Sequence, residues 1–153
     1  KGGLVIWIQT TAAPEATENW GVYRELYTPE NWERRNTELA EDHEGYKIWP
    51  ELNTEQSDLY VKKSRFSAFI PGSSNIAKKL SSHNIDTLLI SGVATNVCCE
   101  ATARDAMMLN YRTIMVMDGL AAMTLDYHEN ALKALYGMFV DVQNADEICE
   151  KLS

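Results

Sequence analysis

The feature that most constrains the fold is a regular alternation of short apolar runs with helix-like segments from residue 58 onward. The expected strands are residues 59–62, 87–91, 113–117 and 139–142, and the expected helices are residues 74–82, 97–109, 128–136 and 145–152, the last with Asn144 as its cap. Such alternation predicts βαβ units and therefore a parallel sheet, with right-handed crossovers placing helices on both faces.

The chain opens with a further apolar run, Leu4 to Ile8, behind two glycines. A run of this kind is typical of a strand that is buried on both faces of a parallel sheet. A globular domain seldom begins with its most buried strand, so we expect sequence upstream of Lys1 to belong to the same domain. Residues 1–153 would then form a single domain that is incomplete at its N-terminus.

A long polar and acidic connection covers residues 10–56 and is unusually aromatic. We expect a helix cap at Thr28 with a short helix after it, and an extended stretch at 48–52 that is fixed by its proline. A connection of this length usually has a function or makes a contact. Packing over a sheet edge or against another subunit is favoured over a lid for most of its aromatic residues, which are Trp20, Tyr23, Tyr27, Trp32, Tyr46 and Trp49.

The charge and the apolar runs argue against several classes of partner. The 14 Lys and Arg against 22 Asp and Glu give a net charge of −8, which disfavours a nucleic acid. No run approaches the length of a membrane span and the start has no signal-peptide layout, so we expect a cytoplasmic protein without a membrane partner.

The cysteines and histidines do not form the spacing of a zinc site. Three cysteines are an odd number, and neighbouring Cys98 and Cys99 rarely pair, so reduced thiols are expected. There is no CxxC pattern, and His43, His83 and His128 are scattered. We therefore expect neither a metal nor another cofactor.

The loop after the strand 87–91 is the first place to look for chemistry, because ligands in open α/β sheets bind beyond the carboxyl ends of the strands. Cys98 follows this loop at the start of a helix. The partial positive charge there favours the thiolate, which is the attacking form, and the same N–H groups can hold the oxyanion of a tetrahedral intermediate. Position alone supports a nucleophile and a small core residue equally.

The other candidates are weaker. Cys99 is expected to face the core side that Ala103 and Ala106 share, and Cys149 to be structural. His128 opens a predicted helix and is expected on the surface, so a Cys–His pair is disfavoured.

Two adjacent lysines, Lys62 and Lys63, end a strand at the sheet edge where Cys98 is expected. A lysine there would stabilise a thiolate or orient a substrate, although adjacent lysines are more often a solvated strand end.

Residues 91–106 read SGVATNVCCEATARDA and residues 63–69 read KSRFSAF. These segments resemble the nucleophile loop and the lysine loop of the isochorismatase-like cysteine hydrolases, which include nicotinamidases, N-carbamoylsarcosine amidases and ureidoacrylate amidohydrolases. The similarity runs from about Gly3 to the C-terminus. It implies a three-layer α/β/α fold with a mostly parallel, Rossmann-like sheet that lacks the family's first strand in this chain.

The resemblance also assigns roles to residues. Cys98 corresponds to the nucleophile and Lys63, rather than Lys62, to the catalytic lysine. The backbone N–H groups of Ala94 and Cys98 correspond to the oxyanion hole, and a cis peptide bond is expected between Val93 and Ala94.

The family's third catalytic member is an aspartate in a segment resembling Asp-Met-Gln, which this sequence lacks. Gly2 to Gln9 match the family's second strand, so the aspartate is expected upstream of Lys1. Asp118 matches a later, supporting aspartate. As written, the chain is therefore expected to be inactive alone.

The implied activity is cysteine-dependent hydrolysis of a C–N bond in a small carbamoyl, ureido or amide substrate, through a thioester. Metal-dependent nicotinamidases carry an Asp-x-His pattern where this chain has Thr10 to Pro14, so the resemblance favours a zinc-free carbamoyl or ureido amidohydrolase over a nicotinamidase. The family member that cleaves the isochorismate ether lacks the cysteine, so hydrolysis of that ether is disfavoured. The alternatives are a nicotinamidase-like amidase, a non-catalytic binding or interaction module, and a redox sensor that uses Cys98 and Cys99. A homo-oligomer, dimer or tetramer, is expected from the family.

Overall fold

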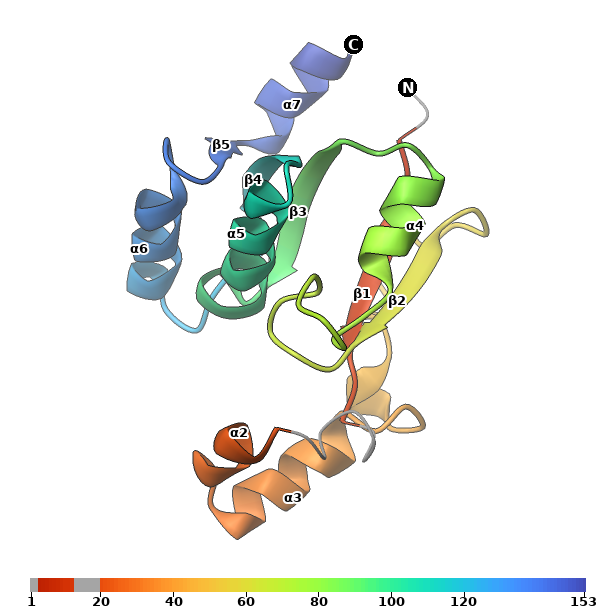
Figure 1. Ribbon diagram of the computed structural model, residues 1–153, viewed down its shortest axis with the longest axis vertical. Helices are drawn as coiled ribbons and strands as arrows, with labels where there is room; N and C mark the ends of the chain where they lie inside the picture. The colour runs from red at the N-terminus through yellow and green to blue at the C-terminus, as the bar shows by residue number, and fades with distance from the viewer. Residues whose placement is uncertain (1–2, 13–19) are drawn as a thin grey trace.

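The computed structural model describes residues 3–12 and 20–153, and its described strands are all parallel (Figure 1). The strands are β1 (Ile6–Thr10), β2 (Leu59–Lys63), β3 (Thr87–Val93), β4 (Arg112–Ala121) and β5 (Asp141–Gln143). The helices are α2 (Gly21–Glu25), α3 (Pro29–Glu38), α4 (Ile76–Ser82), α5 (Glu100–Met108), α6 (Leu125–Leu135) and α7 (Ala145–Leu152), with short turns η1 (Glu44–Tyr46) and η2 (Thr95–Cys99). The prediction of an α/β fold with parallel strands and flanking helices is confirmed.

The described strands form two sheets, one with the order β1–β2 and the other with the order β3–β4–β5. One apolar cluster joins them, because Ile6 of β1 and Leu88 of β3 both pack against it beneath α4. A second cluster lies between β4, α5 and α6 and includes Met115, Ala103 and Leu135. The shared cluster fixes the two sheets relative to each other.

The first strand differs from its prediction. β1 begins at Ile6 rather than Leu4, and Ile8 is 38% exposed, so the expectation of burial on both faces is wrong. The physical reason lies in the sheet, because β1 pairs with β2 on one edge and has no strand hydrogen-bonded to its other edge among the described residues.

The later helices show how capping sets their starts. α7 has its predicted bounds, and Asn144 forms a capping box with Glu147. α6 begins three residues earlier than expected, because the Thr124 side chain accepts the Tyr127 N–H and caps the helix there. The segment predicted as helix 97–109 begins as the π-helical turn η2 and continues as α5.

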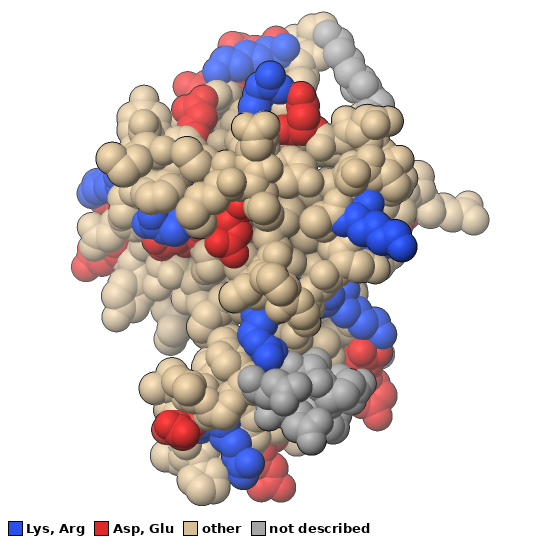
Figure 2. Space-filling view, viewed as in Figure 1, with Lys and Arg blue, Asp and Glu red and all other residues tan. Residues whose placement is uncertain are grey.

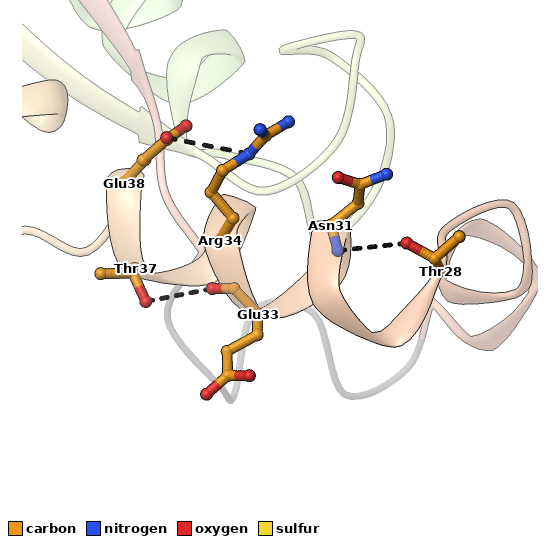
Figure 3. Close-up of polar contacts among 6 residues, drawn as sticks. All are labelled: Thr28, Asn31, Glu33, Arg34, Thr37 and Glu38. Carbon is orange, nitrogen blue, oxygen red and sulfur yellow. Dashed lines mark hydrogen bonds and ion pairs between the residues drawn. The ribbon is translucent and has the colours of Figure 1, made fainter.

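The predicted helix after Thr28 is α3 (Figure 3). The Thr28 hydroxyl accepts the Asn31 N–H, as a cap does, and the Thr37 hydroxyl donates to the Glu33 carbonyl farther along. The predicted extended stretch at 48–52 is wrong, because its proline initiates a turn in which the Leu52 N–H bonds to the Trp49 carbonyl.

The helices α2 and α3 form a lobe below the sheets in Figure 1. The aromatic residues on these helices and beside them pack on one another. Tyr23 stacks on Trp20 with ring centroids 4.0 Å apart, and both rings contact Phe66 of the segment 63–69. Burial and the hydrogen bond with Tyr27 raise the pKa of Tyr23. The lobe thus packs on the loop after β2 rather than on a sheet edge.

Charged side chains on the face shown in Figure 2 are interspersed, with basic groups beside acidic ones. Exposed ion pairs such as Lys133–Glu129 and Arg112–Asp86 contribute little stability, because water screens them. Within residues 3–12 and 20–153, no helix has the length and apolar character needed to cross a membrane.

Candidate active site

Lys63 and Cys98 meet at the carboxyl edge of the sheets. The Lys63 Nζ lies 3.4 Å from the Cys98 Sγ and donates a 2.8 Å hydrogen bond to the Arg65 carbonyl. Lys62 points the other way, where it is exposed and pairs with Glu41. Successive side chains of a strand point to opposite faces, so only one of the two lysines can reach the thiol.

Lys63 is only 5% exposed, which is unusual for a lysine. A buried ammonium group is costly unless it has hydrogen-bond or charge partners. Among residues 3–12 and 20–153, no carboxylate lies within ion-pair distance of Lys63. The Cys98 sulfur is thus the neighbour that can supply a compensating negative charge in that part of the chain.

The loop that presents Cys98 has an unusual backbone. Gly92 adopts a φ of +108°, a region that glycine enters without steric cost, and the Val93–Ala94 peptide is cis, as the resemblance to the family implies. The Ala94 carbonyl accepts the N–H groups of Val97 and Cys99, each at 3.2 Å. These bonds turn the chain sharply, so that Cys98 enters the site from the turn η2 before α5 begins.

The loop that follows Lys63 is held in place by several hydrogen bonds. The Ser73 hydroxyl donates to the Ser67 carbonyl at 2.6 Å and accepts the Arg65 N–H at 3.2 Å. The Ala68 N–H donates to the Thr102 hydroxyl of α5 at 3.2 Å. This last bond connects the loop of Lys63 to the helix that follows Cys98. Sequence reasoning did not single out Thr102 or Ser73.

The other two cysteines have different surroundings. Cys99 is in the core beside Ala103, as predicted. Burial is the main cause that raises the pKa of its thiol to about 12, and the neighbouring Cys98 is a smaller one. Cys149 is exposed, so the expectation that it is structural is wrong. Its neighbour Ile148 is the buried residue of α7.

His128 is not the surface residue that the sequence predicts. It is half-buried, and its Nδ1 lies 2.9 Å from the Thr95 hydroxyl in the nucleophile turn. The error follows from the helix start, because α6 begins at Leu125 and His128 therefore lies at the end of its first turn, facing η2. The cap residue Thr124 was the signal that could have located this start.

Asp118 lies in β4, and its Oδ1 accepts the Ala145 N–H at the first residue of α7 with a 2.9 Å distance. His83 follows α4 directly, and His43 accepts the Gly45 N–H. Within the described ranges there is no cluster of three or more His, Cys, Asp or Glu side chains that could hold a metal ion.

Comparisons with known proteins show to which family the chain belongs. The family described as the isochorismatase domain matches residues 1–147. A ureidoacrylate amidohydrolase, RutB from Pseudomonas savastanoi pv. phaseolicola, is 31% identical over 118 residues, which are 75% of this chain and 46% of that protein. The uncharacterized isochorismatase family protein YwoC from Bacillus subtilis is 28% identical over 67% of this chain and 53% of its own length. The chain thus spans about half the length of these curated relatives.

Solved structures share the fold. An isochorismatase-like hydrolase from Alkaliphilus metalliredigens matches all of this chain and 75% of its own with a TM-score of 0.79 and 25% identity. A cysteine hydrolase from Pseudomonas syringae pv. phaseolicola matches 97% of this chain and 71% of its own with a TM-score of 0.85, and at 23% identity this likeness concerns the fold alone. Since the family match covers nearly the whole chain, the protein belongs to the isochorismatase family.

Proposed function

We propose that the chain carries the nucleophile and the lysine of an amidohydrolase that cleaves a C–N bond in a small carbamoyl, ureido or amide substrate. The observation that supports this most directly is the 3.4 Å approach of the buried Lys63 Nζ to the Cys98 Sγ. An ammonium group at this distance stabilises the thiolate over the thiol, and the thiolate is the nucleophile.

In the first step, the Cys98 sulfur attacks the substrate carbonyl carbon, a C–S bond forms, and the carbonyl π electrons move to the oxygen. The backbone N–H groups of Ala94 and Cys98 are the proposed donors to this oxyanion. The tetrahedral intermediate then collapses, the C–N bond breaks, and ammonia or an amine leaves with an added proton. The product of this step is a thioester on Cys98.

In the second step, water attacks the thioester carbonyl and gives up a proton. The C–S bond breaks, so that the acid is released and the Cys98 thiol is restored. Lys63 orients the reacting groups and balances the thiolate charge at both stages. The chemistry needs no metal, in keeping with the absence of the Asp-x-His pattern at Thr10 to Pro14.

A proton must move from the thiol to the leaving nitrogen, and in the family an aspartate carries it. We infer that this carboxylate belongs on a parallel strand between β1 and β3, whose facing edges bear no strand among the described residues. The two sheets would then join into the central sheet of a three-layer α/β/α fold. Without that strand, residues 1–153 are expected to turn over no faster than the uncatalysed background.

The test is ammonia release from a panel of ureido, carbamoyl and simple amide substrates. If the coding sequence upstream of Lys1 specifies an apolar strand that ends in aspartate, the protein translated with it is expected to hydrolyse at least one class, and Cys98→Ala to abolish the activity. Turnover that survives in a folded Cys98→Ala protein would refute the proposal. Thr37→Val, an exposed change far along α3, is the matched control.

One observation favours a second candidate, a non-catalytic family member that binds such molecules. No described carboxylate lies beside Lys63, so the proton carrier of the reaction is absent from that part of the chain. Binding of a panel compound without ammonia release, by a protein that includes the upstream sequence, would favour this candidate.

The homo-oligomer, a dimer or a tetramer, stays a prediction. Sedimentation analysis measures the number of subunits.

A further inference from the structure

The Thr95 side chain is fully buried at the start of the nucleophile turn, and the hydrogen bond that holds its hydroxyl comes from another element. His128 of α6 supplies the partner, with Nδ1 2.9 Å from Oγ1. The His128 backbone is itself fixed, because its N–H donates to the carbonyl of the capping residue Thr124. The first turn of α6 thus holds the first residue of the turn that presents Cys98.

Thr95 is connected by its backbone to the rest of this turn. The Thr95 carbonyl accepts a hydrogen bond from the N–H of Glu100, the first residue of α5. The carbonyl of the preceding residue, Ala94, accepts hydrogen bonds from the N–H groups of Val97 and Cys99. Cys98 lies between these bonded positions. A displacement of Thr95 would therefore tilt the turn and move the Cys98 sulfur relative to the Lys63 ammonium group.

We propose that His128 is a positioning residue for the nucleophile, which it holds toward Lys63 through the Thr95 hydroxyl. The proposal rests on the proposed role of Cys98. It assigns to His128 no contact with substrate and no proton transfer, since its ring bonds to Thr95 rather than to the sulfur. Its effect is to keep the thiol in the geometry in which the ammonium group stabilises the thiolate.

A simpler interpretation is that His128 only satisfies a buried hydroxyl, as buried polar groups require. The two interpretations differ in what they predict at the sulfur. A purely structural bond changes stability and leaves the reactivity of Cys98 in the folded protein unchanged. A positioning bond changes that reactivity even where the fold is intact.

The experiment measures the rate at which iodoacetamide alkylates Cys98 in the folded 153-residue chain, with each modified cysteine located by peptide fragmentation. It needs no turnover, so its failure is distinguishable from failure of the proposed enzyme activity. The exposed Cys149 is an internal control for reagent and pH. The buried Cys99 reports unfolding, because it becomes accessible only when the core opens.

Five variants separate the interpretations. His128→Leu and Thr95→Val keep the approximate size and remove one partner each, and both are expected to slow Cys98 alkylation roughly three- to tenfold, the rate equivalent of a lost hydrogen bond. The double variant is expected to be no slower than either single one, because the two changes remove one bond. His128→Asn places an amide where Nδ1 lies and Thr95→Ser keeps the hydroxyl, so both are expected to restore most of the rate.

Unchanged or faster Cys98 alkylation in His128→Leu, with Cys99 still protected, would overturn the proposal. So would additive effects of the two single changes, or failure of both Asn and Ser to restore the rate. If His128→Leu exposes Cys99, the comparison of Thr95→Val with Thr95→Ser decides by the same criterion.

Discussion

Replacing Thr102 with valine tests whether one buried hydrogen bond joins the two halves of the candidate site. The Thr102 hydroxyl accepts the N–H of Ala68, and these residues are 7% and 1% exposed. Valine has nearly the same shape, so the change opens no cavity and leaves a buried N–H without its acceptor. Such a group costs about 1–3 kcal/mol, and we expect ~2 kcal/mol here.

This loss is large enough to measure in two ways. With a urea dependence of about 2 kcal/mol per molar, the unfolding midpoint falls by roughly 1 M. The melting temperature falls by about 4–8 °C for a chain of this size. Circular dichroism at increasing urea or temperature gives both values, provided that the transition is two-state.

Two matched variants control this experiment. Thr102→Ser keeps the acceptor and loses only a methyl group, so its midpoint is expected within about 0.5 M of the parent. Thr37→Val makes the same substitution in α3, where the hydroxyl is exposed (Figure 3), and is expected to change the midpoint little. A midpoint for Thr102→Val within about 0.3 M of the parent, or an equal effect of Thr37→Val, would refute the reasoning.

Further predictions concern the core, one cap and one thiol. Leu135→Ala removes a fully buried side chain and is expected to cost about 2–5 kcal/mol by urea unfolding, whereas Leu109→Ala, at 54% exposure, changes stability much less. Thr28→Ala removes the cap of α3 and is expected to cost about 1 kcal/mol, with Thr28→Ser as the control that retains it. Burial raises the pKa of Cys99 to about 12, above its unfolded value, so the stability that the neutral thiol contributes is fully present below the unfolded pKa and is expected to be lost as pH rises from there towards 12. A urea series from pH 8 to 11, compared with Cys99→Ala, measures this loss, and equal pH profiles for the two proteins would contradict it.

Local sequence patterns located the strands and helices from residue 58 onward, although several bounds differ: α6 begins at Leu125 rather than at 128, and the strand predicted at 139–142 is observed as Asp141–Gln143. Strand and helix periodicities depend on which neighbouring residues share a face, so a short stretch of sequence is enough to recognise them. The capping of α7 by Asn144 is likewise a local interaction, and its bounds agree with the prediction. Because Lys63 ends its strand and Cys98 follows another parallel strand, their placement at one edge could also be anticipated.

The remaining features depend on partners that are distant in sequence. Thr102 bonds to a residue 34 positions away and His128 to one 33 positions away, so no periodicity around either residue signals its partner. The burial of Ile8 depends on what lies beside β1, which the apolar run itself cannot specify. Pro50 restricts the residue before it, but it is also compatible with the turn that forms.

The distribution of the site over two sheets makes its chemistry depend on how firmly those sheets are held together. Lys63 ends β2 of one sheet, whereas Cys98 follows β3 of the other, and these sheets share no strand pairing in the described part of the chain. What joins them there is the apolar cluster beneath α4, the bond between Ala68 and Thr102, and the Lys63–Cys98 contact itself. A parallel strand between β1 and β3 would replace these side-chain links with two ladders of backbone hydrogen bonds. The proposed carboxylate strand would therefore both complete the proton path and fix the distance between the lysine and the nucleophile.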